Sequence, residues 1–460
     1  MYQLRFDIPA HVHFIGIGGI SMSGLAEILL SKGFTVSGSD SKSSQLTDHL
    51  SKKGAVVFIG QSEANIISST DLVVFTAAIK EDNPEYTACV SLGIPMLSRA
   101  ELLGQIMDNF KNSVAISGTH GKTTTTSMIG QILVCAETDP TLSVGGILKS
   151  IQGNIRIGNS DIFVTEACEY TNSFLHFHPL VEIILNIEAE HLDFFKDLDD
   201  VRNSFRLFAK NTKSQGTLII NHEIEGIDEL TSGLSCQILT YGFTEASDFA
   251  ASAISFDILG HGSYTLQFQG KELGRIELHV PGIHNISNSL AAYAAAHSLG
   301  LSFDVIRQGF AEFTGPDRRF ELKGFLANGA MVVDDYSHHP TEVHAALSAA
   351  SAIPGKRIVC VFQPHTYSRT KAFLEEFAEV LSMADLVILT DIYAARELNT
   401  YQISTEDLYE RMLEAGTNVL YMKSFDDIEL YLKKNSFKND LLITMGAGDV
   451  VTIGEHLLNQ

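Results

Sequence analysis

The sequence has few cysteines and prolines and no long hydrophobic run. The five cysteines are scattered and never form a CxxC pair, which excludes a zinc knuckle and argues against a disulfide framework. No uninterrupted apolar run reaches the roughly 18 residues that a membrane-spanning helix needs, and the first residues lack the charged-then-apolar pattern of a signal peptide. Only 10 prolines and 45% hydrophobic residues are typical of a globular protein. We therefore expect a cytoplasmic protein that does not enter a membrane.

Positive charge is also scarce. The 32 lysines and arginines are outnumbered by 55 aspartates and glutamates, which gives a formal charge of −23. Such an acidic surface repels nucleic acid and anionic lipid, so we expect neither as a general partner. A phosphorylated substrate requires a site that supplies its own positive charge against this background.

The length and the hydrophobic pattern predict an α/β protein of three domains. At roughly 150 residues for each domain, 460 residues suggest about three. Short apolar runs alternate with amphipathic stretches, which is the pattern of β-α-β units on parallel sheets. We place the domains at 1–106, 107–315 and 316–460. The first is predicted to be Rossmann-like, the central one a P-loop-type ATPase domain with a mostly parallel sheet and an antiparallel appendage at 250–280, and the last a doubly wound, Rossmann-like domain.

The strongest local signal is the segment SGTHGKTTTT at residues 117–126. A predicted strand ends in a glycine-containing turn, and a helix starts at Lys122. The N–H groups of such a turn bind phosphate oxygens, the lysine can bridge the β- and γ-phosphates, and the Thr123 hydroxyl can bind Mg²⁺. The usual GxxxxGK[ST] spacing needs glycine where Ile116 stands, so this loop is a compacted variant. The alternative is a tight turn before a helix.

A second glycine-rich turn, GIGGISMSG, lies near the N-terminus. Gly16, Gly18 and Gly19 follow a predicted strand and precede a helix, and Asp40 ends the next strand, at the spacing of about 20 residues where a ribose is often bound. Alone, this pattern predicts a dinucleotide site, or glycines that merely allow close helix packing. An anionic diphosphate can bind at that helix N-terminus. The chain therefore offers two separate phosphate sites.

Acidic and imidazole side chains follow two predicted strands of the central domain. Glu166 ends the strand in DIFVTEA, and His191 follows the strand in VEIILNI. Both stand at carboxyl ends of strands in the sheet that carries the phosphate loop, where the ligands of such sheets bind. A carboxylate and an imidazole there can complete a divalent-metal site with phosphate oxygens and water. A lone histidine after a strand is otherwise more often structural.

Further polar clusters occur at helix starts and strand ends. PGIHNISN puts His284, Asn285 and Asn288 at the start of a helix, where they can cap it or hydrogen-bond a base. GPDRRFE puts Arg318 and Arg319 at a domain junction, where one of them can reach a γ-phosphate. DDYSHHPTEV and QPHTYSRT both follow strands of the last domain. Capping or a surface salt bridge explains any one of these residues, but their joint appearance predicts a binding face.

Eight motifs, taken in their order along the chain, resemble those of the Mur ligase family. They are GIGGISMSGLA, GTHGKTTTT, EACEY, NIEAEHLD, PGIHNISNSLAA, DRRFE, DDYSHHPTEV and QPHTYSRT. The resemblance runs from about residue 12 to Asp449. It is greatest to the members that attach L-alanine to the lactyl carboxylate of UDP-N-acetylmuramate through an acyl phosphate, in cytoplasmic peptidoglycan precursor synthesis. It implies ATP and Mg²⁺ as cofactors, UDP-N-acetylmuramate and L-alanine as substrates, and a last domain that closes over ATP and binds the amino acid.

The resemblance also implies roles for individual residues. The UDP-sugar would be bound by Gly16, Gly18, Gly19, Asp40, Thr76 and Arg369. ATP would be bound by Gly118, Thr119, His120, Gly121, Lys122, Thr123, Thr124, His284, Asn285, Asn288, Arg319 and Asp335. The amino acid would be bordered by Tyr336 and His338, and the metal held by Thr123, Glu166 and His191. The catalytic set would be Lys122, Glu166, His191, Arg319 and His338.

Two positions depart from the family pattern. Cys168 stands where many relatives have aspartate, and Thr366 where some have arginine, which leaves Arg369 as the carboxylate contact. We assign no carbamylated-lysine role to Lys210. The nearest alternative function is a ligase of cell-wall recycling that attaches a tripeptide to the same sugar nucleotide. A nicotinamide-dependent oxidoreductase explains only the first glycine-rich turn, and an ATP-gated scaffold leaves the acid and histidine cluster without a role. Selectivity among alanine, glycine and serine, and the oligomeric state, are not predicted.

Overall fold

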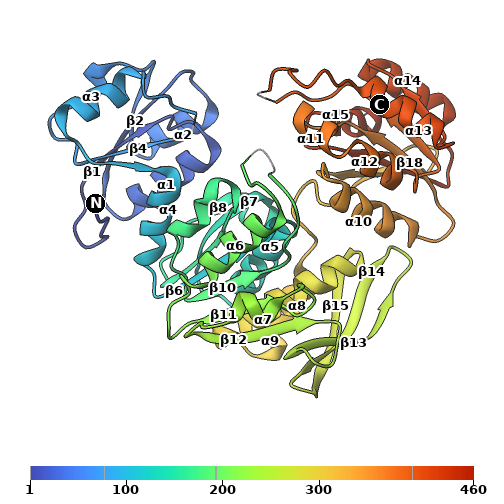
Figure 1. The fold of residues 1–460 in the computed structure, drawn as a ribbon, viewed down its shortest axis with the longest axis horizontal. Helices are drawn as coiled ribbons and strands as arrows, with labels where there is room; N and C mark the ends of the chain where they lie inside the picture. Colours follow the sequence, from blue (N-terminus) through green and yellow to red (C-terminus); the bar gives the residue numbers. More distant parts are fainter. Residues whose placement is uncertain (1, 77, 192–193, 396, 460) are drawn as a thin grey trace.

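The computed structural model describes residues 2–76, 78–191, 194–395 and 397–459. These residues form three α/β bodies that follow one another along the chain, each around its own sheet (Figure 1). The predicted three-domain α/β architecture is therefore confirmed, whereas the positions of the domain boundaries stay predictions. No described helix is long and apolar enough to cross a membrane.

The N-terminal domain is built on a parallel sheet. Its elements are β1 (His11–Ile15), α1 (Ile20–Ser31), β2 (Thr35–Asp40), α2 (Gln45–Lys52), β3 (Val56–Ile59), η1 (Glu63–Asn65), β4 (Leu72–Phe75), α3 (Pro84–Leu92), β5 (Met96–Ser98) and α4 (Arg99–Asp108). The spatial order is β3-β2-β1-β4-β5. Val12 and Phe14 of β1 pack with Leu25 and Leu29 of α1, because alternate strand residues point to the same face. The order reverses between β1 and β4, and the turn after β1 therefore lies where such sheets bind ligands.

The central domain is built on a longer, mixed sheet. Its elements are β6 (Asn112–Ser117), α5 (Lys122–Cys135), β7 (Thr141–Leu148), η2 (Lys149–Ile151), β8 (Gly153–Arg156), β9 (Ile162–Glu166), η3 (Tyr170–His176), β10 (Val181–Ile184), α6 (Leu198–Ala209), β11 (Thr217–Asn221), α7 (Ile227–Thr231), β12 (Gln237–Gly242), β13 (Phe249–Phe256), β14 (His261–Phe268), β15 (Lys271–Pro281), α8 (Ile283–Ser298) and α9 (Phe303–Glu312). The order is β15-β14-β13-β12-β11-β10-β6-β9-β7-β8. The strands β13, β14 and β15 pair antiparallel, as predicted for the appendage.

Two apolar layers enclose this sheet. The alanines of α8 are buried with Met128 and Ile132 of α5, because small side chains let the helix approach its neighbours closely. On the other face, Phe163 of β9 stacks on Phe110, which follows α4, with ring centroids 5.1 Å apart, in an apolar cluster that also holds core residues of the N-terminal sheet. The two domains therefore share one continuous apolar core.

The C-terminal domain is a third, mostly parallel sheet. Its elements are β16 (Glu321–Phe325), β17 (Met331–Asp335), α10 (Pro340–Ser351), β18 (Arg357–Phe362), α11 (Tyr367–Ala372), α12 (Leu374–Leu381), β19 (Leu386–Leu389), α13 (Thr405–Glu414), β20 (Val419–Tyr421), α14 (Phe425–Asn435), β21 (Asp440–Met445) and α15 (Val451–Leu458). The order is β16-β17-β21-β18-β19-β20, and β16 is an antiparallel edge strand. Alternating strands and helices give the predicted doubly wound domain.

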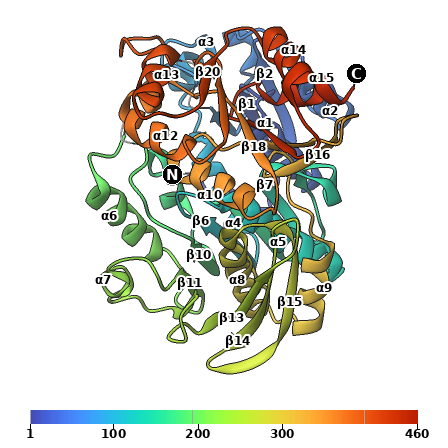
Figure 2. The same cartoon turned by 90° about the vertical axis from the view of Figure 1, so that its right-hand side faces the viewer.

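The central and C-terminal domains meet where strands of both sheets end. Figures 1 and 2 both show α10 at the edge of the C-terminal domain, next to the central one. Thr341, in the first turn of α10, donates a hydrogen bond of 2.8 Å to Glu188, which follows β10. Arg369, which follows β18, lies 3.6 Å from Glu190. The loops after these strands therefore form an interdomain seam.

Candidate active site

The phosphate loop has the predicted strand, turn and helix. The strand β6 ends at Ser117 and α5 begins at Lys122. Gly118 and Gly121 have φ of +137° and +86°, a region that favours glycine. A Cβ on Gly118 would lie 2.8 Å from the Leu185 side chain, so there is also no room for one. The turn thus presents backbone N–H groups at the N-terminus of α5, an arrangement that binds phosphate.

Lys122 is held inside the loop. Its ammonium donates hydrogen bonds to the carbonyl oxygens of Gly118 and Thr119, the latter at 2.9 Å, and to Glu169 at 3.1 Å. Burial alone lowers the pKa of Lys122, but the neighbouring carboxylates, Glu169 first, outweigh it and raise the pKa above its ordinary value. The side chain is therefore a fixed positive charge in a region of net negative charge.

Carboxylates and a histidine converge beside the start of α5. The Thr123 hydroxyl donates to Glu166 at 3.1 Å, and the other Glu166 oxygen accepts from the N–H of Gly145 at 2.5 Å. Burial raises the pKa of Glu166, against these hydrogen bonds. One potential ligand atom from each of Glu169, Glu190 and His191 lies within 4.8 Å of the others. A hydroxyl and several carboxylates suit a hard divalent cation such as Mg²⁺.

A cavity of about 240 Å³ lies between the central and C-terminal domains. The predicted nucleotide residues that line it are His120, Gly121, Thr124, His284, Asn285, Asn288, Arg319 and Asp335. Burial, with the charge of Arg319, lowers the pKa of His284 to about 4, so this imidazole is neutral at pH 7. Such a cavity offers neutral hydrogen-bonding groups at one side and charged groups beside the phosphate loop.

The first turns of α8 place two asparagine side chains, Asn285 and Asn288, beside the phosphate loop. Asn285 donates to the carbonyl oxygen of Pro281 at 2.8 Å, and Asn288 donates to Asn285 at 3.1 Å. The Asn288 oxygen lies so near the turn that a Cβ on Gly121 would be 2.6 Å from it. These contacts couple the position of α8 to the turn.

The two neighbouring arginines have different surroundings. The Arg318 guanidinium is held within its own domain, because it donates hydrogen bonds to Asp334 at 2.9 Å and to the carbonyl oxygen of Gly446 at 2.7 Å. Arg319 lines the cavity. Asp335 accepts from the backbone N–H groups of Phe320 and Ser337, both at 2.7 Å, so both of its carboxylate oxygens are engaged with nearby backbone.

The predicted amino-acid residues lie on the C-terminal side of the seam. The Tyr336 ring packs under Arg319, with the guanidinium 5.4 Å from the ring centroid. The His338 imidazole lies 2.9 Å from the Tyr336 carbonyl oxygen and 5.5 Å from the His365 ring. Tyr336 and His338 do not line the second cavity, of about 200 Å³; its lining includes Tyr170, Glu190, His191, His365, Thr366, Arg369 and Phe373. His191 and Arg369, far apart in the sequence, therefore share one cavity.

The N-terminal turn brings together five of the six residues predicted for the UDP-sugar. Asp40 accepts the N–H of Gly18 at 2.9 Å, and a Cβ on Gly18 would be 2.8 Å from that carboxylate. A Cβ on Gly16 would be 2.7 Å from the Thr76 methyl group, and Gly19 precedes α1 directly. Arg369 does not join this group, because it lies at the interdomain seam. The close contacts of Asp40 and Thr76 with the turn explain why glycine is needed at 16 and 18.

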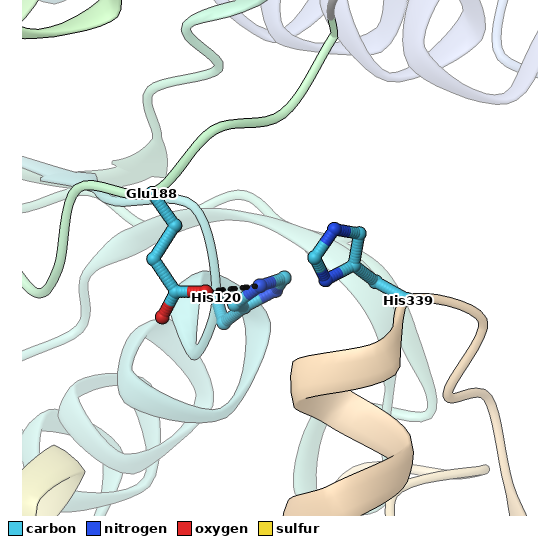
Figure 3. Close-up of side chains that lie close together, drawn as sticks. All are labelled: His120, Glu188 and His339. Atoms are coloured by element: carbon cyan, nitrogen blue, oxygen red, sulfur yellow. Dashed lines mark ion pairs between the residues drawn. The ribbon is translucent and has the colours of Figure 1, made fainter. Parts of the chain in front are cut away.

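Several acidic residues at the seam were not predicted as site residues. His120 lies between Glu188, at 3.6 Å, and Glu342, at 3.4 Å. Figure 3 shows His120 flanked by Glu188 of the central domain and His339 of the C-terminal domain. Burial lowers the pKa of His120, but the imidazole's hydrogen bonds to the Glu188 and Glu342 carboxylates raise it to about 10. The sequence does carry these acids within NIEAEH and HHPTEV, but no pattern in it shows that the two motifs meet.

Three family models match successive parts of the chain. They are the Mur ligase family catalytic domain at 11–111, the Mur ligase middle domain at 116–296 and the Mur ligase glutamate ligase domain at 318–448. The chain therefore belongs to the Mur ligase family, as the motif order predicts.

Individual relatives match over the full length. The UDP-N-acetylmuramate–L-alanine ligases of Agathobacter rectalis and Lachnospira eligens are 59% and 55% identical, each over 100% of both chains. The crystal structure of UDP-N-acetylmuramate-alanine ligase from Thermotoga maritima is similar with a TM-score of 0.79 at 29% identity, covering 98% of each chain. A murein peptide ligase from Psychrobacter arcticus has a TM-score of 0.70 at 24% identity, also covering 98% of each chain, and this likeness shows the fold.

Proposed function

We propose that this chain joins L-alanine to the lactyl carboxylate of UDP-N-acetylmuramate and converts ATP to ADP and phosphate. The observation that carries this is the 59% identity, over the whole of both chains, to a UDP-N-acetylmuramate–L-alanine ligase. The phosphate loop and the two cavities at the interdomain seam support it. A role in peptidoglycan precursor synthesis follows from the product, and a cytoplasmic location stays a prediction.

The reaction has two covalent steps. A lactyl carboxylate oxygen attacks the γ-phosphorus in line, the bond from that phosphorus to the β-phosphate oxygen breaks, and ADP leaves with that electron pair. The alanine amine then attacks the acyl carbon, loses a proton, and phosphate leaves. Phosphoryl transfer depends mainly on positioning and on stabilising charge on the moving group. We assign this stabilisation to Lys122 in the loop and to Arg319 across the cavity.

Mg²⁺ is the metal that the oxygen-rich donors at the start of α5 fit. Thr123, Glu166 and His191 would hold it, as the family resemblance implies. When bound, such an ion neutralises negative charge on the phosphate oxygens. The surplus of carboxylates there over Lys122 supports this assignment.

The remaining nucleotide contacts follow from the cavity lining. The loop residues Gly118 to Thr124 would hold the phosphates, and Asn285, Asn288 and the neutral His284 would contact the nucleoside. Asp335 would contact the nucleotide, and it also holds the backbone just after Arg319 and just after β17.

The amino acid would be bordered by Tyr336 and His338, beside the second cavity, whose lining residue His365 lies next to His338. Burial lowers the pKa of His338, and the nearby Arg369 and Arg319 act in the same direction against Glu342. A neutral imidazole there can accept the proton that the alanine ammonium must lose before it attacks. Arg369 would bind a substrate carboxylate at the same cavity.

The UDP portion would bind at the turn formed by Gly16, Gly18, Gly19, Asp40 and Thr76. This turn belongs to the N-terminal domain, which Figure 1 shows apart from the seam. A substrate that spans both places requires the three domains, which we divide near residues 106 and 315, to close on one another.

The test is a phosphate-release assay with UDP-N-acetylmuramate, ATP, Mg²⁺ and one amino acid at a time. We expect release that needs both the sugar nucleotide and L-alanine. Preference for a tripeptide that begins with L-alanine would instead assign the chain to the recycling ligase.

A further inference from the structure

The carboxylate of Glu342 lies at a junction of three chain segments. Glu342 stands in the first turn of α10, and only 13% of its side-chain surface is exposed. One oxygen lies 3.4 Å from Nδ1 of His120 and 3.5 Å from Nη1 of Arg319. The other accepts the backbone N–H of His338 at 3.1 Å. One side chain thus contacts the phosphate loop, the segment that enters the C-terminal domain, and the proposed amino-acid site.

The contact between Glu342 and His120 depends on how the C-terminal domain sits on the central one. His120 belongs to the turn after β6, whereas Glu342 belongs to the C-terminal domain. The hydrogen bond from Thr341 to Glu188 crosses the same seam one residue earlier. When α10 moves away from the central domain, His120 loses Glu342 while Glu188 stays beside it.

The charge of Glu342 is unfavourable for direct nucleotide binding. Its side chain lines the cavity that would receive an anionic triphosphate, and a carboxylate facing phosphate repels it. Burial favours the protonated form of Glu342, but the neighbouring His338 and His120 rings and the Arg319 guanidinium hold its pKa well below the ordinary range. It is therefore ionised, and the groups it satisfies are cations and N–H donors.

We propose that Glu342 is a positioning residue that couples the seating of the C-terminal domain to the phosphate loop. Its carboxylate fixes the Arg319 guanidinium of its own domain and the His120 imidazolium of the phosphate loop in the geometry that γ-phosphoryl transfer needs, and it reaches His120 only when α10 rests on the central domain. The kinetic consequence rests on the proposed ligase function, whereas the interdomain coupling does not.

The kinetic test compares Glu342→Gln with a matched control in the same domain. Glutamine keeps the shape and can still accept the His338 N–H, but it removes the charge. We expect kcat to fall by about 10- to 100-fold, because a displaced catalytic group costs that much, while the KM for ATP stays unchanged or falls and the KM for UDP-N-acetylmuramate stays unchanged. The control is Glu429→Gln: Glu429 is 6% exposed and is bonded by the His456 imidazole at 2.8 Å, within the C-terminal domain. Its kcat should stay within about twofold of wild type, as expected of a substitution remote from the site.

The coupling itself is measured without substrate by hydrogen–deuterium exchange. We expect faster exchange than wild type in residues 118–122 and 338–346 of Glu342→Gln, and wild-type exchange there in Glu429→Gln. If Glu342→Gln does not fold, Glu342→Asp, which keeps the charge but withdraws it by one methylene, should show the same changes to a smaller extent.

Three results would overturn the proposal. They are an unchanged kcat, whatever the KM for ATP, an equal loss in the Glu429 control, and unchanged exchange at both segments. Failure of the wild-type protein to turn over would refute the ligase function alone, since the exchange experiment still decides the coupling.

Discussion

Glu182 is an acid buried in the central sheet, and it should make the stability of the protein depend on pH. It lies on β10 with no exposed surface. Among the described residues, its carboxyl group has one hydrogen bond, of 2.8 Å, from the Thr212 hydroxyl, and the second carboxyl oxygen has no partner. Burial raises its pKa from 4.5 to about 8. Between these values the unfolded chain releases a proton that the folded protein keeps, so the free energy of unfolding falls as pH rises.

The magnitude follows from the two pKa values. Each pH unit between the two pKa values lowers the free energy of unfolding by about 1.4 kcal/mol. The full loss between pH 4.5 and pH 8 is therefore about 5 kcal/mol, of which about 3 kcal/mol is already lost at pH 7. The loss is complete above pH 8 and absent below pH 4.5. Glu182→Gln removes this titration, although its buried amide costs about 1–3 kcal/mol at every pH.

The assay measures hydrogen exchange in residues 181–187 and the melting temperature by circular dichroism, at pH 5, 6, 7 and 8. We expect the difference in stability between Glu182→Gln and wild type to shift in favour of the variant at each step to higher pH. The control is Glu245→Gln, at an exposed position in the same domain, for which the difference should stay constant. A constant difference for Glu182→Gln as well would refute the reasoning that burial keeps this acid protonated.

Three further predictions, each on one residue of the proposed substrate sites, follow from the structure. Lys122→Ala should lower kcat by at least about 10²-fold, which is the size of a single electrostatic contribution to catalysis. The double variant Lys122→Ala/Glu169→Gln should regain thermal stability but not activity, because it removes the carboxylate that Lys122→Ala leaves unpaired. Near-normal turnover of Lys122→Ala would contradict the phosphate role. Gly18→Val should abolish binding of UDP-N-acetylmuramate in calorimetry and leave binding of an ATP analogue intact, since its side chain collides with Asp40; the reverse pattern would exchange the two domain assignments. Thr123→Ala should weaken Mg²⁺-dependent ATP binding or turnover and spare the UDP-sugar, and equal binding with and without Mg²⁺ in wild type would count against the metal site.

Local features of the site could be predicted from the sequence because each depends on neighbouring residues. The loop before Lys122 was predictable from glycines that follow an apolar run and precede a helix, and the structure places them at positive φ. Glu166 and His191 were predictable at the same edge of the central sheet, because the carboxyl ends of parallel strands lie there, although the carboxylates nearest His191 are those of Glu169 and Glu190. The resemblance of the ordered motifs to the Mur ligase family added the roles, which stay predictions for the individual residues.

Contacts between domains could not be predicted in the same way. The pairing of His120 with Glu342, and of Thr341 with Glu188, depends on how α10 sits on the central domain, which no local pattern specifies. The contact of Asp40 with the N–H of Gly18 was missed for a different reason. An acid at the end of the second strand is usually interpreted as a ribose contact, whereas here the Asp40 carboxylate also accepts a hydrogen bond from the glycine-rich turn.

The central claim is that this chain forms the bond between L-alanine and UDP-N-acetylmuramate at the expense of ATP. The most direct measurement is to incubate the wild-type protein with all three substrates and Mg²⁺, and to quantify phosphate and the sugar-nucleotide product by mass spectrometry. We predict equal amounts of phosphate and of UDP-N-acetylmuramoyl-L-alanine, and neither when L-alanine or UDP-N-acetylmuramate is omitted. Phosphate release that does not depend on L-alanine, or product formation only with a tripeptide, would contradict the account.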